Sequence, residues 1–188
     1  MRETAHGAAA RRLRGLVRVM LAGLASIPAD AVAQRPGRGT LPPSIRAELT
    51  RLYPGWRFAT VAPRLRPQLA PGQTPDWIAG DFDADGRRDY AVQIVHPAAP
   101  RSLQSVLAFL GRDKGYRRLL VQDSLPESGG FYLALARRGE RVADLEADLN
   151  GDSTFVLRSD GIQVLFAQEA GSTCFYRRGR FRCIVSSD

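Results

Sequence analysis

The sequence predicts an α+β fold that is mostly β, in which an antiparallel meander sheet follows one N-terminal amphipathic helix. Three features support this class. Short apolar runs succeed one another from residue 77 to the C-terminal end, segments rich in Gly, Asp and Asn separate them, and residues 45–53 show a helical apolar period. Strands at regular spacing with such turns are typical of an antiparallel sheet, and a helix can cover one of its faces.

The expected helix spans residues 45–53, with Ile45, Leu49 and Leu52 on one face. Ser44 precedes it and can cap its first turn through its hydroxyl group. Pro54 follows directly and ends the helix, because proline cannot continue the hydrogen-bond ladder. This segment therefore supplies the apolar stripe that we expect against the sheet.

Apolar or alternating segments after the helix predict the strands. Residues 62–76 contain four prolines and are expected to form a loop. Residues 103–110 are apolar enough for either a helix or a strand, but the short run and the following Gly111 favour a strand. The predicted strands are 56–61, 77–80, 90–95, 103–110, 116–121, 131–136, 154–157 and 162–167.

The two cysteines, Cys174 and Cys183, flank a predicted hairpin. Arg178 and Gly179 suit a two-residue turn, in which glycine supplies a positive φ. Counting back from that turn, Cys174 faces Cys183 in a non-hydrogen-bonded pair, where the two chains approach most closely. This geometry predicts a disulfide in an oxidising compartment; in a reducing compartment the same residues would remain two thiols.

Residues 1–33 resemble a signal peptide, with basic residues at 11–14, an apolar run at 19–27 and a small-x-small cleavage site at 31–33. An amphipathic N-terminal segment is the alternative, because Arg18 adjoins the apolar run. That run is shorter than the ~20 residues that span a bilayer, so we expect no stable membrane insertion after cleavage. The expected organisation is a signal peptide at 1–33, a Gly/Pro linker at 34–43 and one β-rich domain at 44–188, secreted or periplasmic.

The net charge of +8 raises the question of nucleic-acid binding. Of the 27 basic residues only Lys114 is a lysine, and the arginines are scattered among carboxylates. A nucleic-acid footprint would instead gather on one face together with stacking aromatic residues. We therefore expect no nucleic-acid partner, and leave open an unknown protein or glycan partner.

An acidic loop, residues 81–89, is the sharpest chemical feature. Asp81, Asp83, Asp85 and Asp89 occupy loop positions 1, 3, 5 and 9, with a glycine at position 6 that permits a sharp turn. Alternate carboxylates in a tight loop can converge on Ca²⁺, and the backbone carbonyl of Arg87 at position 7 would add a ligand. A solvated Asp/Gly hairpin without metal is the alternative.

This loop is not an EF-hand, because Val92 stands at position 12 and strands are expected on both sides. The arrangement strand–DxDxDGxxD–strand resembles the calcium loops of FG-GAP (VCBS-type) repeats, as in the integrin alpha-chain propeller. That resemblance implies Asp81, Asp83, Asp85 and Asp89 as side-chain ligands and Ca²⁺ as the cofactor. The chain carries one good copy, whereas a propeller typically needs four or more blades, so we expect no full propeller.

Catalytic arrangements are weak in this sequence. His96 is the only histidine after residue 34, no Gly-x-Ser-x-Gly elbow accompanies it, and we expect it at the surface. The first hypothesis is therefore an exported, non-enzymatic Ca²⁺-binding β module with a structural or binding role. The alternatives are a secreted inhibitor or immunity-type protein acting on an extracellular enzyme, and a metal-dependent hydrolase that uses the acidic loop.

Overall fold

The computed structural model describes residues 40–69, 74–98, 100–126, 130–145, 154–166 and 171–186. All of them belong to one unit, Arg35–Asp188. The predicted signal peptide, and the linker up to residue 39, lie outside the described residues. Among the residues described, none lies in a helix long and apolar enough to cross a membrane.

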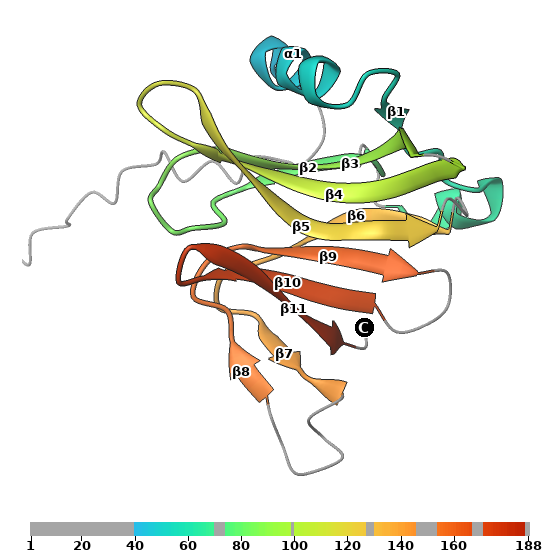
Figure 1. Cartoon of the computed structure of the whole chain (residues 1–188). Helices are drawn as coiled ribbons and strands as arrows, with labels where there is room; N and C mark the ends of the chain where they lie inside the picture. The colour runs from blue at the N-terminus through green and yellow to red at the C-terminus, as the bar shows by residue number, and fades with distance from the viewer. Residues whose placement is uncertain are drawn as a thin grey trace, which may run out of the picture. The chain divides into compact units, whose positions relative to one another are not determined.

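The first sheet has five antiparallel strands (Figure 1). Its order is β1 (Arg57–Phe58), β3 (Asp89–Ala98), β4 (Arg101–Gly111) and β5 (Tyr116–Pro126), and β2 (Trp77–Gly80) also pairs with β3. β3 and β4 stay paired up to Ala98 and Arg101, so both strands are longer than their apolar runs predicted. Residues 103–110 lie in a strand, as expected.

The second sheet has the order β11 (Arg180–Ser186), β10 (Gly171–Arg177), β9 (Gly161–Phe166) and β6 (Phe131–Ala136). A separate hairpin pairs β7 (Arg141–Ala143) with β8 (Thr154–Val156). The mostly β, α+β class with antiparallel strands and one helix is confirmed. The division into separate sheets was not predicted, and it arises because β6 pairs with β9 rather than with β5.

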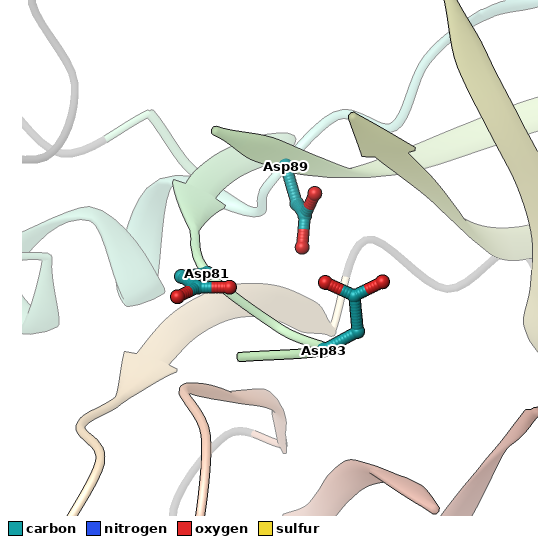
Figure 2. A group of neighbouring side chains, drawn as sticks. All are labelled: Asp81, Asp83 and Asp89. Carbon is teal, nitrogen blue, oxygen red and sulfur yellow. The ribbon is translucent and has the colours of Figure 1, made fainter. Parts of the chain in front are cut away.

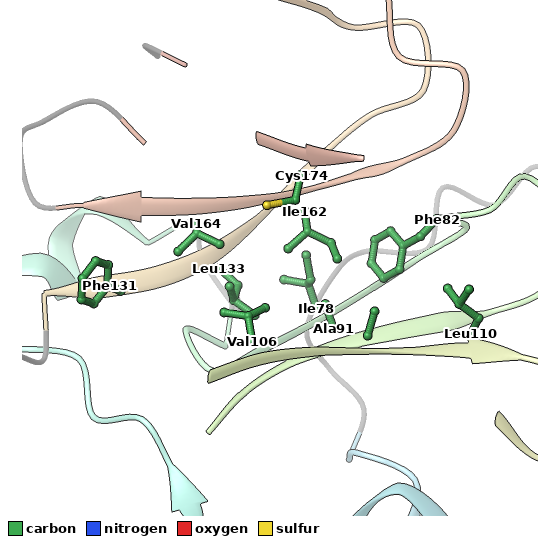
Figure 3. Packing of buried hydrophobic residues seen from close by; sticks show 11 residues of the cluster. Ile78, Phe82, Ala91, Val106, Leu110, Phe131, Leu133, Ile162, Val164 and Cys174 are labelled. Carbon is green, nitrogen blue, oxygen red and sulfur yellow. The ribbon is translucent and has the colours of Figure 1, made fainter. Parts of the chain in front are cut away.

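The main core lies between the two sheets (Figure 3). Side chains from β2 to β4 meet side chains from β6, β9 and β10, in the manner of a β-sandwich. Phe82, in the acidic loop, also belongs to this core and is fully buried. The core residues are Ile78, Phe82, Ala91, Val106, Ala108, Leu110, Phe131, Leu133, Ile162, Val164 and Cys174.

Helix α1 (Pro43–Leu52) covers the opposite face of the first sheet. Ile45 and Leu49 are fully buried there, as their spacing predicted. The predicted N-cap is wrong: the helix begins at Pro43, the N-cap is Pro42, and no side-chain hydrogen bond caps it. Proline suits the first helical position because its fixed φ is already helical and it has no N–H to satisfy.

Two segments between α1 and β2 differ from expectation. The strand predicted at 56–61 is reduced to β1, two residues paired with the far end of β3. The loop predicted at 62–76 contains a 3₁₀ helix, Pro63–Gln68. Proline at the start of that helix again supplies a φ compatible with helical turns.

The cysteine hairpin has the predicted register. Cys174 faces Cys183, their Cα atoms lie 4.0 Å apart, and the two residues form a disulfide. Arg178 and Gly179 both have positive φ, 52° and 86°, as a type I′ turn requires. The bond links the buried side of β10 to β11, the edge strand of the second sheet.

Candidate metal centre

The acidic loop connects β2 to β3 and closes on their last cross-strand pair, Gly80 and Asp89. Asp81, Asp83 and Asp89 each offer one carboxylate oxygen, and these oxygens lie within 4.8 Å of one another. Figure 2 shows the three carboxylates facing one another. Ca²⁺ binds oxygens at about 2.3–2.6 Å, so small side-chain shifts would bring all of them onto one ion.

Asp81 organises the loop by accepting backbone hydrogen bonds. Its Oδ1 accepts the N–H of Asp85 at 3.1 Å, and its Oδ2 accepts the N–H of Gly86 at 3.0 Å. Ala84 and Gly86 have positive φ values of 60° and 80°, which turn these N–H groups inward. The DxDxDG sequence thus folds the loop around the first carboxylate.

Asp89 is fully buried and closes the loop. Its Oδ2 accepts the N–H of Phe82 at 2.7 Å, and its Oδ1 accepts the N–H of Gly111 at 2.7 Å. Burial raises the pKa of Asp89 to about 6; the two N–H donors oppose the rise, and the charges of Asp83 and Asp85 add to it. A nearby cation would favour the ionised form of this carboxylate.

Asp83 is largely buried, and its two carboxylate oxygens have different surroundings. Its side chain is only 8% exposed, and its Oδ2 accepts a hydrogen bond from Arg112 Nη2 at 2.7 Å. Its Oδ1 is buried and has no hydrogen-bond partner among the described residues. A buried carboxylate oxygen without a partner is costly, and a cation between Asp81, Asp83 and Asp89 would satisfy it.

Asp85 lies outside the group of converging oxygens. Its Oδ2 is 3.0 Å from Arg112 Nη1 and 3.7 Å from Arg87 Nε, while its Oδ1 accepts the N–H of Arg87 at 2.9 Å. Arg87 also pairs through Nη1 with Asp113, on the neighbouring β4–β5 turn, at 2.5 Å. The structure therefore brings together Asp81, Asp83 and Asp89 and directs Asp85 toward arginines.

Two further residues of this region were not found from the sequence. Arg112 reaches the loop from the β4–β5 turn, and Asp160 reaches it from the turn before β9. Asp160 Oδ2 accepts the N–H of Asp81 at 3.1 Å, and the N–H of Asp160 donates to the carbonyl of Asp81 at 3.0 Å. Neither residue carries a local sequence signal, because each contact joins segments distant in the chain.

His96, expected at the surface, is half-buried and lies in a hydrogen-bonded row across β3, β4 and β5. Ser105 Oγ donates to Asp123 Oδ1 at 2.6 Å and lies 3.0 Å from His96 Nε2. The serine therefore stands between the histidine and the carboxylate, whereas a catalytic triad places the histidine in the middle. Ser105 is also 1% exposed, so this row does not present an activated nucleophile.

Comparison with protein-family models, with curated proteins and with solved structures finds no match to this chain. Asp81, Asp83 and Asp89 form a partly buried group of carboxylates at one end of the first sheet.

Proposed function

We propose that this chain is an exported, non-enzymatic β module whose acidic loop binds Ca²⁺ and uses the ion to stabilise its fold. The observation that carries the proposal is the buried Oδ1 of Asp83, which has no hydrogen-bond partner among the described residues. Asp83 belongs to the same group of carboxylates as Asp81 and Asp89. Without a cation these negative charges repel one another across a few ångströms.

Ca²⁺ suits this site better than Mg²⁺. Mg²⁺ demands near-ideal octahedral geometry and loses its waters reluctantly, whereas Ca²⁺ accepts irregular sets of six to eight oxygens. Asp81 and Asp89 are held by backbone N–H groups, and Asp85 and the carbonyl of Arg87 lie in the same short loop. An irregular set with some solvent ligands fits the larger ion.

A structural role follows from where the loop is attached. Phe82 lies between Asp81 and Asp83 and is fully buried in the core between the sheets. Binding energy at the carboxylates would therefore stabilise the position of Phe82. By mass action an ion that binds only the folded chain adds about 2.7 kcal/mol at one hundred times its Kd.

Export is supported by the Cys174–Cys183 disulfide, which is compatible with an oxidising compartment. The predicted signal peptide at 1–33 points the same way. Expression of the full chain in a bacterial host, followed by fractionation and intact-mass measurement, tests this part. We expect a periplasmic or secreted product that begins at Gln34; an uncleaved, reduced product would contradict it.

Calorimetric titration and thermal melting test calcium binding. We expect the protein to bind Ca²⁺ more tightly than Mg²⁺ and to melt at a higher temperature in Ca²⁺ than in a chelator. Asp83→Asn should remove that difference, whereas Asp113→Asn should keep it, because Asp113 is 87% exposed and lies outside the carboxylate group. Equal melting temperatures of the native chain with and without Ca²⁺ would sink the proposal.

A further inference from the structure

The β4–β5 turn places a guanidinium on the outer side of the acidic loop. Arg112 Nη2 donates to Asp83 Oδ2 at 2.7 Å, and Arg112 Nη1 donates to Asp85 Oδ2 at 3.0 Å. Nη1 also donates to the carbonyl of Gly111 at 2.6 Å. One side chain therefore bridges two carboxylates of the loop and is tied to its own backbone while it does so.

Backbone hydrogen bonds fix the segment around Arg112 next to the acidic loop. The N–H of Gly111 donates to Asp89 Oδ1 at 2.7 Å, and the N–H of Arg112 donates to the carbonyl of Gly115 at 3.0 Å. A Cβ at Gly111 would lie 2.9 Å from the carbonyl oxygen of Arg88. This close approach needs glycine, and it fixes the point from which Arg112 reaches the aspartates.

The positive charge of Arg112 lies beside two carboxylates that a metal ion in the loop would also use. Arg112 contacts one oxygen of Asp83 and one of Asp85, while the other oxygen of Asp83 has no hydrogen-bond partner in the described part of the chain. Asp85 thereby lies outside the group formed by Asp81, Asp83 and Asp89. Asp85, the fourth carboxylate that the sequence predicted as a ligand, is hydrogen-bonded to Arg112 instead of facing the other three.

We propose that Arg112 is a resident cation of the acidic loop that competes with Ca²⁺ for Asp83 and Asp85 and so sets the calcium affinity. This inference rests on the proposed function, because it concerns the same loop. The guanidinium neutralises part of the loop's charge in the ion-free protein. When Ca²⁺ binds, charge repulsion drives Arg112 away, and its one-third-exposed side chain has solvent to move into. Asp85 is then released to turn toward the ion.

Two consequences follow from this competition. The loop stays folded without an ion, because Arg112 compensates Asp83 and Asp85. The affinity for Ca²⁺ is lower than the carboxylates alone would give, because each binding event must first break the arginine contacts. When a ligand can bind only after another group has moved away, its apparent affinity falls in proportion to the fraction of molecules in which that group has already moved.

The test compares two variants, Arg112→Gln and Arg88→Gln. Each removes one positive charge, but Arg88 belongs to the acidic loop itself. Arg88 is exposed, and its guanidinium carbon lies 5.8 Å from the centre of the Tyr90 ring rather than on a carboxylate. We expect Arg112→Gln to lower the calorimetric Kd for Ca²⁺ about tenfold, within the range of coupling between neighbouring sites. Arg88→Gln should change it far less. In chelator, Arg112→Gln should also melt below the native chain.

The outcomes separate this inference from the proposed function. If the native chain binds Ca²⁺ and Arg112→Gln binds it no more tightly than Arg88→Gln does, the inference is overturned and the function stands. If only Arg112→Gln binds Ca²⁺, the inference is supported and the proposed function fails, because the arginine then replaces the ion. If neither binds Ca²⁺, both fail.

Arg112→Lys covers the case in which the glutamine variant does not fold. Lysine keeps the charge but lacks the planar fork that bridges two carboxylates. We expect a Kd for Ca²⁺ between those of the native chain and the glutamine variant. An unchanged Kd in the folded lysine variant would overturn the inference.

Discussion

The carboxylate of Asp89 accepts the backbone N–H of Gly111 at 2.7 Å and so joins the acidic loop to the β4–β5 turn. With its other oxygen it accepts the N–H of Phe82. Asp89 is thus part of the fold whether or not an ion is present. The acidic loop thus combines a buried, fully hydrogen-bonded carboxylate, Asp89, with Asp83, whose buried Oδ1 has no hydrogen-bond partner among the described residues.

The pKa of Asp89 predicts a pH dependence of stability in the ion-free protein. Burial raises this pKa to about 6, above the ~3.9 of an unfolded aspartate. Between these values the folded state holds a proton that the unfolded state has lost, so the contribution of Asp89 to the unfolding free energy falls as pH rises from about 4 to about 6. Above that range the contribution is level.

Urea unfolding in metal-free buffers from pH 4 to 7.5 measures this effect, with Asp89→Asn as the comparison. The asparagine variant should be less stable throughout the neutral range, because one of the two N–H groups loses its acceptor. Its decline between about pH 4 and 6 should be shallower than that of the native chain. Identical pH profiles would show that Asp89 does not titrate there.

Gly86 predicts a purely conformational cost. It has a φ of 80°, and an added Cβ would meet no atom within 4 Å. Gly86→Ala should therefore destabilise the protein by about 1–2 kcal/mol through backbone strain alone. Ala84→Gly is the matched variant, because Ala84 has a φ of 60°, and it should cost little. Equal urea midpoints for the native chain and Gly86→Ala would contradict this.

Reduction of the Cys174–Cys183 disulfide should lower the unfolding free energy by about 2 kcal/mol, because the bond closes a short loop in the unfolded chain. Chemical denaturation with and without a reductant measures the change. Cys183→Ser provides the control, since Cys183 is exposed and its replacement leaves the core intact. In that variant the reductant should have no further effect.

The β10–β11 hairpin contains a like-charge pair that can be improved. Arg177 and Arg180 face each other directly beside the turn, and both are exposed. Arg180→Glu should raise stability by about 0.2–1 kcal/mol, the range of opposite-charge cross-strand pairs. Arg178→Glu, at the turn itself, should gain less. The advantage of Arg180→Glu should shrink in 1 M salt, where charges are screened beyond about 3 Å.

The features that the sequence predicted well are local. Cys174 and Cys183 could be paired because they lie only nine positions apart in the sequence and the turn sets their register. The acidic loop could be recognised because its four aspartates lie within nine consecutive residues of the sequence. The buried helix face, with Ile45 and Leu49, followed from helical periodicity.

The features that the sequence did not predict depend on distant contacts. The pairing of β6 with β9 separates the strands into two sheets, and both strands are apolar enough to fit either one. β7 has a single buried apolar residue, Val142, and leaves no recognisable strand pattern. Arg112 is one arginine among many in the sequence, and only the fold places it on Asp83 and Asp85.

The paired hydrogen bonds between Asp81 and Asp160 have a consequence for the lifetime of the folded state. They tie the acidic loop of the first sheet to the turn that begins β9 in the second. A loop held rigid by a cation would have to yield before the two layers of the sandwich could separate. A bound ion would then slow unfolding, so that a kinetic barrier as well as equilibrium stability would preserve the folded state.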